Sequence, residues 1–223
     1  MFMRLPPAIQ ALLWINGGMF LLQLMVGGNA FTPLLLWPLG GDAQFNNPIA
    51  SVLGNFVPWQ LVTYAFLHAD IGHLFFNMLA LLMFGAPLEY TWGTKRFLTF
   101  YFVCVVGAAL TYLGWAALLH VALLHVALPI LGASGGIFGL LLAYGLLFPR
   151  QKIMPFPGLE FEARTLVIVF GALQVAYAVT GTGGDVARLA HLGGMLFGWL
   201  IIRYWRGQPP FKRRKRPGPR IVR

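Results

Sequence analysis

Charged side chains are scarce in this chain. Only 10% of its 223 residues are Asp, Glu, Lys or Arg, whereas 58% are hydrophobic, and the mean hydropathy is +0.73. Soluble globular domains usually carry about 25% charged residues. A chain so poor in charge cannot cover a water-facing surface, so a soluble protein is excluded and a membrane protein is predicted. The length fits one compact domain.

Cysteine is nearly absent as well. Cys104 is the one cysteine, so no disulfide can form within the chain, and its apolar surroundings predict a small buried side chain. A cleavable leader is not indicated either. A single basic residue, Arg4, precedes the first apolar run, and no small-residue cleavage site follows promptly. We therefore expect the first apolar run to be a retained helix.

Several segments approach the roughly 20 apolar residues that a membrane helix needs. We count six, at about 9–27, 72–90, 97–118, 131–149, 165–181 and 188–205. The stretch 29–67 is too rich in polar residues, Pro and Gly to be a seventh span. We expect it to lie along the membrane surface as a long first outer loop, with Trp37 and Trp59 at headgroup level. The predicted fold is all-α, a six-helix membrane domain over residues 1–206.

The distribution of charge predicts the orientation. With six spans both termini share one side, and every Lys and Arg except Arg188 falls on that side. The positive-inside rule then places both termini in the cytoplasm. The net charge of +10 comes mostly from the tail at 207–223. Its Pro and Gly content predicts disorder, and its position beside a membrane helix favours contact with anionic lipid over nucleic acid.

A tandem repeat, LLHVALLHVA, occupies residues 118–127. No repeat on the scale of a fold accompanies it. We expect a local duplication in an outer loop, with His120 and His125 as surface residues.

Four polar side chains fall at one depth of the predicted bundle. His73 and Asn77 lie near the start of the second span, Ser134 near the start of the fourth and His191 near the start of the sixth. The even-numbered spans all run inward, so these residues lie roughly 5–10 Å below the outer surface. Each alone has an ordinary interpretation, as a backbone or interhelical hydrogen bond. Their joint occurrence at one depth instead indicates a site.

Glycines accompany both the serine and the second histidine. Gly132 and Gly135 flank Ser134, and Gly194 and Gly198 share a helix face with His191. Small residues let membrane helices approach closely. Such an approach is what a Ser–His hydrogen bond between two helices requires.

The chemistry that these residues allow is acyl transfer. A serine becomes nucleophilic when a histidine takes its proton. No carboxylate offers itself as a third member, so a Ser134–His191 pair is predicted, with Phe138 packed on the His191 ring. The Asn77 amide, His73 and the backbone N–H of Ser134 are the expected donors to the oxyanion. We expect neither a cofactor nor a metal ion.

These elements resemble the rhomboid intramembrane proteases. The matching segments are GASG at 132–135, HLFFN at 73–77, AHLGGMLFG at 190–198, WQLVTYAFLH at 59–68 and GAPLEYTWG at 85–93. The resemblance implies a six-helix bundle that cleaves single-span membrane proteins near their outer boundary. It also implies Ser134 as nucleophile, His191 as general base stacked on Phe138, and His73 and Asn77 as oxyanion helpers. An inner membrane of a bacterium is the implied location.

One departure and two alternatives remain. The family often has Trp-Arg in the first loop, and here Trp59 is followed by Gln60, which leaves the anchoring of that loop open. A rhomboid-like protein that binds membrane clients without cleaving them is the first alternative, although such relatives usually lack the Ser or the His. A small transporter is the second, but polar residues confined to one depth do not form a path across the membrane.

Overall fold

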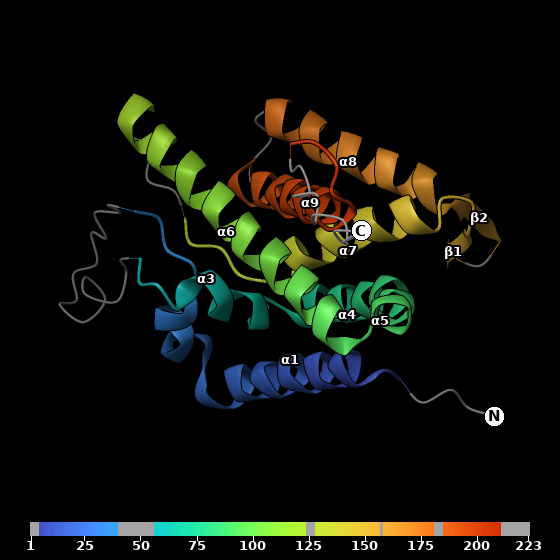
Figure 1. Cartoon of the computed structure of the whole chain (residues 1–223). Coiled ribbons are helices and arrows are strands. Elements are labelled where there is room, and N and C mark those ends of the chain that lie inside the picture. The colour runs from blue at the N-terminus through green and yellow to red at the C-terminus, as the bar shows by residue number, and fades with distance from the viewer. Residues whose placement is uncertain (1–4, 40–55, 124–127, 157, 181–184, 211–223) are drawn as a thin grey trace, which may run out of the picture.

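The computed structural model describes residues 5–39, 56–123, 128–156, 158–180 and 185–210, and this part of the chain is mostly helical (Figure 1). The helices are α1 (Pro7–Val26), η1 (Gly28–Leu34), α3 (Gln60–Thr63), η2 (Tyr64–Phe66), α4 (Ile71–Ala80), η3 (Leu81–Gly85), α5 (Ala86–Trp92), α6 (Thr94–Leu123), α7 (Ser134–Leu147), α8 (Ala163–Thr180) and α9 (Asp185–Arg206). Each of the six predicted ranges coincides with a helix or, for α4–η3–α5, with a continuous helical run.

Among the described residues, three helical stretches are long and apolar enough to cross a membrane. They cover Pro7–Val26, Ile71–Trp92 and Thr94–Leu118, while the apolar helices at Ser134–Leu147 and Ala163–Ala178 are shorter. The second of the three contains the five-residue π-helical turn η3. Such turns inside α-helices frequently occur at functional sites.

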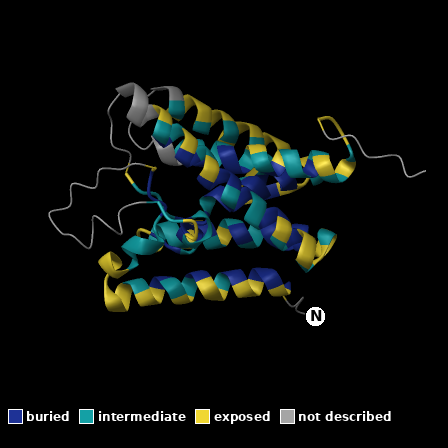
Figure 2. Cartoon of the chain, turned by 60° about the vertical axis from the view of Figure 1, so that its left-hand side comes forward, coloured by how far each residue is buried: buried dark blue, intermediate teal, exposed yellow. Residues whose placement is uncertain are grey.

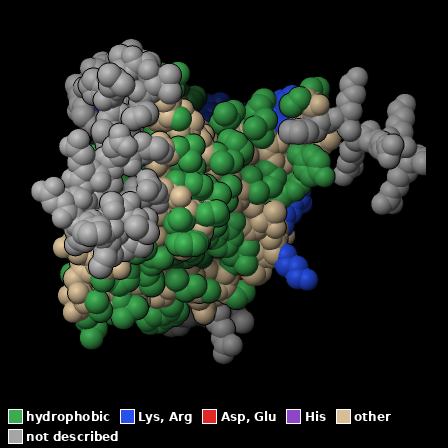
Figure 3. Space-filling view, turned by 90° about the vertical axis from the view of Figure 1, so that its left-hand side faces the viewer, with side chains coloured by type: hydrophobic (Ala, Val, Ile, Leu, Met, Phe, Trp, Pro, Cys, Tyr) green, Lys and Arg blue, Asp and Glu red, His purple; other side chains and the backbone are tan. Residues whose placement is uncertain are grey.

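The core lies where α6, α7 and α9 pack together, and α1 lies at the edge (Figures 1 and 2). The outward face of α1 is apolar and exposed, with Trp14 at 78% and Met25 at 81% exposure. Hydrophobic side chains also cover most of the face in Figure 3, with Lys and Arg along one edge. An apolar exterior over a packed interior is what a lipid environment requires.

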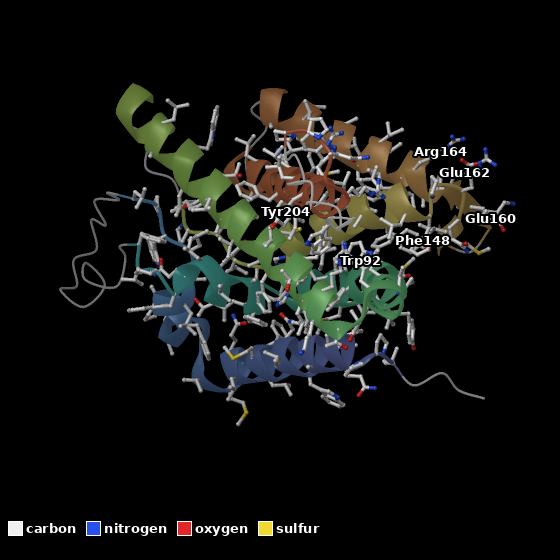
Figure 4. All side chains as sticks on the ribbon, in the orientation of Figure 1. Trp92, Phe148, Glu160, Glu162, Arg164 and Tyr204 are labelled. Carbon is white, nitrogen blue, oxygen red and sulfur yellow. The ribbon has the colours of Figure 1, made fainter. Side chains whose placement is uncertain are left out.

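Local structure differs from the expectation in two places. The strands β1 (Lys152–Phe156) and β2 (Leu159–Glu162) pair antiparallel, so the described chain is mostly helical and not entirely all-α. The segment's prolines disfavour a helix, and Gly158 turns with φ +83°. Glu160, Glu162 and Arg164 gather at this hairpin (Figure 4). The expected outer loop at the LLHVA duplication is wrong for residues 118–123, because α6 continues to Leu123. Residues 124–127 of the duplication lie outside the described part of the chain.

Gln60 anchors the described part of the first loop. Its side chain is fully buried. Its Oε1 accepts the N–H groups of Trp37 and Val57 at 3.2 and 3.3 Å, and its Nε2 donates to the carbonyl of Pro33 at 3.2 Å. Trp37 is buried within the protein, where its ring donates to the carbonyl of Thr32, so it presents little surface to lipid headgroups. Trp59, in contrast, is 54% exposed.

Glu89 joins three helices through one buried carboxylate. It accepts the N–H groups of Ala8 and Ile9 at 2.9 Å each, in the first turn of α1. It also accepts the hydroxyl of Thr94, the first residue of α6, at 2.8 Å. The first N–H groups of a helix have no partner within it, and a negative charge there is favourable. Glu89 therefore fixes α1 to the rest of the bundle.

Replacing Glu89 by alanine is expected to lower the free energy of unfolding by about 2–4 kcal/mol, because two buried N–H groups lose their acceptor. Reversible unfolding in mixed micelles, followed by circular dichroism, measures the change. Glu160→Ala is the matched control, since its exposed pair with Lys152 (2.9 Å) contributes at most about 1 kcal/mol. Equal losses in the two variants would contradict the assignment.

Candidate active site

The backbone before α7 holds Ser134 at the start of that helix. Ile130 pairs with Leu36 of the first loop, with both N–H···O distances 3.0 Å. The N–H of Gly132 then donates to the carbonyl of Tyr64 at 2.9 Å. This bond leaves the Gly132 N–H unable to serve as an oxyanion donor, whereas the N–H of Ser134 lies in the first turn of α7, where helix N–H groups have no helical acceptor.

Gly132 is required by both its conformation and its surroundings. Its φ of +122° is strained for any residue with a side chain. A Cβ atom there would lie 2.8 Å from both Cε1 and Nε2 of His73. The absence of a side chain therefore lets the His73 ring approach the segment that leads into Ser134.

Ser134 and His191 are in hydrogen-bond contact. The distance between Ser134 Oγ and His191 Nε2 is 2.7 Å, across the boundary between α7 and α9. The two glycine faces meet beside this contact. A Cβ on Gly194 would collide with the backbone carbonyl of Gly135, and one on Gly198 would lie 3.4 Å from Cα of Gly139. The helices are therefore close enough for a short serine side chain to reach the imidazole.

Phe138 lies against one face of the His191 ring. The ring centroids are 4.3 Å apart and the planes differ by 12°. Phe138 is four residues after Ser134 on α7, so one helix carries both the serine and the aromatic ring that packs on the histidine. The stacking restricts the tilt of the imidazole relative to the Phe138 ring.

His73 and Asn77 occupy one face of α4. The Nδ1 atom of His73 accepts the N–H of Ala69 at 3.4 Å, so the neutral ring carries its proton on Nε2, which with Cε1 is one of the two ring atoms nearest to Gly132. Asp70 caps the helix by accepting the N–H of His73 at 2.8 Å. The amide of Asn77 donates one N–H to the carbonyl of His73 at 2.9 Å. Its second N–H is the donor that can serve a ligand.

His68 is buried beside His73, with ring centroids 5.1 Å apart. Burial lowers the pKa of His68 to about 4; His73 acts in the same direction and Asp70 in the opposite one. His68 is therefore neutral at physiological pH and adds no positive charge at this end of α4.

An apolar cavity of about 840 Å³ opens onto these residues. His73, Asn77, Ser134 and His191 line one part of it. The rest of the wall is mainly hydrophobic and comes from α4, η3, α7, α8 and the hairpin, including Phe75, Phe76, Met83, Phe84, Phe138, Leu141, Ile153, Leu166 and Phe170. A few convergent polar groups in an apolar cleft are typical of a binding or catalytic site. Among the described residues, no group of three His, Cys, Asp or Glu is arranged to hold a metal ion.

The sequence reasoning missed Gln174. Its Oε1 atom lies 3.0 Å from Nδ1 of His191, on the side of the ring away from Ser134. A third member of such a site is usually a carboxylate, but two carboxylates have other partners here, Asp70 as a helix cap and Glu89 at α1. A signal was present, because an amide within an otherwise apolar span is costly unless it has a partner.

A match to a known protein family identifies the kind of protein to which this site belongs. The Rhomboid domain family matches residues 55–207, which is more than half of the chain and includes every site residue named above. This chain belongs to the rhomboid family. Its membership and its apolar helices make it an integral membrane protein.

Several curated rhomboids are similar to this chain. Rhomboid protein 1, mitochondrial, of Saccharomyces cerevisiae is 34% identical over 152 residues, covering 65% of this chain and 42% of the relative. Rhomboid protease GluP of Bacillus subtilis is 30% identical over 184 residues, covering 82% and 31%. Rhomboid protease AarA of Providencia stuartii is 28% identical over 153 residues, covering 64% and 54%. The aligned part of this rhomboid thus spans between 31% and 54% of the length of each relative.

Proposed function

We propose that this rhomboid is an intramembrane serine endopeptidase that cleaves single-span membrane proteins near the outer face of the bilayer. The observation that carries the proposal is the 2.7 Å contact between Ser134 Oγ and His191 Nε2 beside a large apolar cavity. A serine that is not a nucleophile needs no histidine at hydrogen-bond distance. A transmembrane substrate, in turn, needs an apolar cleft in which to bind. Two of the relatives are named rhomboid proteases.

In the proposed mechanism, Nε2 of His191 takes the hydroxyl proton while Ser134 Oγ attacks the scissile carbonyl carbon. The carbonyl π-electrons move to its oxygen, which becomes the oxyanion. Collapse of this intermediate breaks the C–N bond, and His191 gives its proton to the departing amine. Water then hydrolyses the acyl-enzyme with His191 again as the base. The cavity must stay open to water for this last step.

The proposed oxyanion donors are three N–H groups from two helices. The backbone N–H of Ser134 comes from α7, whereas Nε2–H of His73 and the second amide N–H of Asn77 come from α4. Donors fixed before the reaction stabilise charge without reorganising, which is the source of their effect on rate. The tautomer that the Ala69 contact selects for His73 supports its part in this set.

The proposed topology has six spans, with both termini in the cytoplasm. It is supported by a helix in each predicted range and by the one-sided distribution of Lys and Arg. Residues 1–206 would form the membrane domain and 207–223 a basic tail that contacts anionic lipid; most of that tail lies outside the described residues. We further propose the inner membrane of a bacterium as the location, as for a minimal bacterial rhomboid.

A fluorophosphonate probe tests the nucleophile directly. We expect the purified full chain in detergent to be labelled once, at Ser134, because the probe reacts with an activated serine. Ser51 is the other serine in the sequence, so Ser51→Ala is the matched control and should label like the wild type. Ser134→Ala and His191→Ala should not label, and mass spectrometry of the adduct identifies the site.

Labelling of Ser134→Ala at the wild-type level would refute the assignment of the nucleophile. A folded wild type that neither labels nor cleaves a single-span reporter would refute the peptidase proposal. That second outcome would favour a rhomboid-like protein that binds membrane clients without cleaving them.

A further inference from the structure

The contact between Gln174 and His191 has no part in the mechanism described so far. Gln174 lies on α8, which packs against α9 and α7. Its Oε1 is 3.0 Å from Nδ1 of His191, while Nε2 of the same ring is 2.7 Å from Ser134 Oγ. The imidazole is thus held at both nitrogens, by side chains from two different helices.

We propose that Gln174 is a positioning residue that selects the tautomer of His191 by accepting the Nδ1 proton. A neutral imidazole carries one proton, on either Nδ1 or Nε2. An amide oxygen can only accept, so its contact favours the proton on Nδ1. Nε2 is then left with a lone pair directed at the hydroxyl of Ser134. The effect of this tautomer on catalysis rests on the proposed peptidase function, because His191 needs the Nε2 lone pair only if it acts as a base.

Phe138 cannot perform this selection by itself. Stacking at 4.3 Å and 12° fixes the plane of the His191 ring. A half-turn of the ring about its Cβ–Cγ bond would restore the same plane and yet exchange the position of Nδ1 with that of a carbon atom. The hydrogen bond to Gln174 removes this freedom, because the rotated ring would present a C–H to Oε1. Plane and rotation are therefore set by different residues, Phe138 from α7 and Gln174 from α8.

An amide suits this position better than a carboxylate. Gln174 lies within an apolar helix, and a charge within a membrane segment is costly. The neutral oxygen orients the histidine without that cost. It also gives the imidazolium less stabilisation than a carboxylate would. A carboxylate at this position should therefore keep His191 protonated to a higher pH.

The end of the Gln174 amide that faces Nδ1 determines the tautomer of His191. A measurement of that tautomer therefore tests the proposal directly. If the amide were reversed, its N–H would donate to Nδ1 and the proton would sit on Nε2, which could not accept from Ser134. Nitrogen-15 NMR of histidine-labelled protein in micelles distinguishes the two tautomers. We expect the wild-type His191 signals, identified by their loss in His191→Ala, to show a protonated Nδ1 and an unprotonated Nε2.

Variants at position 174 test the consequence. We expect Gln174→Leu to lower kcat about 10- to 100-fold on a single-span reporter with KM within about twofold, because the histidine then samples both tautomers. Gln174→Glu restores an acceptor and should recover most of kcat, with the acid limb of its pH profile moved to higher pH. Leu173→Ala is the control on the same helix, since Leu173 is 41% exposed, and should leave kcat unchanged.

Three results would overturn the inference: a wild-type His191 with its proton on Nε2, an unchanged kcat in Gln174→Leu, or equal losses in Gln174→Leu and Gln174→Glu. The tautomer measurement requires neither a variant at position 174 nor cleavage. A wild type that fails to cleave therefore refutes the peptidase proposal, while the tautomer still decides whether Gln174 positions His191.

Discussion

Ser134→Ala is expected to reduce cleavage of a single-span reporter by roughly 10⁴-fold or more, because no other group can form the acyl-enzyme. His191→Ala should cause a loss of similar size, since the serine then has no base at 2.7 Å. Reporter cleavage in proteoliposomes, followed by gel densitometry, measures both variants. Circular dichroism must first show that each is folded.

A variant that carries both substitutions tests whether Ser134 and His191 act as one unit. Residues that act as one unit are not additive, so Ser134→Ala combined with His191→Ala should be no slower than either single variant. Independent roles would instead multiply the two losses. Near wild-type turnover in either single variant would refute the Ser–His pair, and with it the assignment of both residues.

Gly194→Ala is expected to impair both stability and catalysis. The added methyl group would collide with the backbone carbonyl of Gly135, which cannot rotate away as a flexible side chain would. Overpacking of this kind costs about 1–3 kcal/mol of the free energy of unfolding. It would also force α9 away from α7, and a shift of about 1 Å between reacting groups can cost roughly 100-fold in rate.

Gly114→Ala is the matched control for that substitution. Gly114 is exposed on α6, and no atom lies within 4 Å of the position of its missing Cβ. Because alanine favours a helix over glycine by up to about 1 kcal/mol, this variant should be as stable as the wild type or more stable, with unchanged cleavage. A Gly194→Ala protein that cleaves at the wild-type rate would contradict the close approach of α7 and α9.

A comparison of Ser134→Ala with Gly194→Ala separates the effect of helix packing from that of the reacting groups. Ser134→Ala removes a reacting atom and leaves the glycine contact between the helices intact. Gly194→Ala keeps every reacting atom and changes only the distance between two helices. If both reduce cleavage but only Gly194→Ala lowers the unfolding free energy, the glycine contact acts by positioning the pair.

The sequence by itself determined the features that are encoded locally. Hydropathy marked six ranges, each of which contains a helix in the described chain, and three of these helices are long and apolar enough to cross a membrane. The spacing of His73, Asn77, Ser134 and His191 along those ranges predicted their common depth. The glycine faces at Gly135 and Gly194 predicted a close approach of two helices, since small residues at helical spacing have a direct steric meaning.

The tertiary structure decided the contacts between groups far apart in the chain. Gln174 and His191 are 17 residues apart and Glu89 and Ala8 are 81 apart, and no periodic pattern links such partners. The same holds for Gln60, whose amide binds the first loop, an anchoring that the sequence had left open. A hydrogen bond depends on the direction of two side chains as well as on their depth. Depth and helix face follow from local sequence, whereas direction is fixed only when the helices pack.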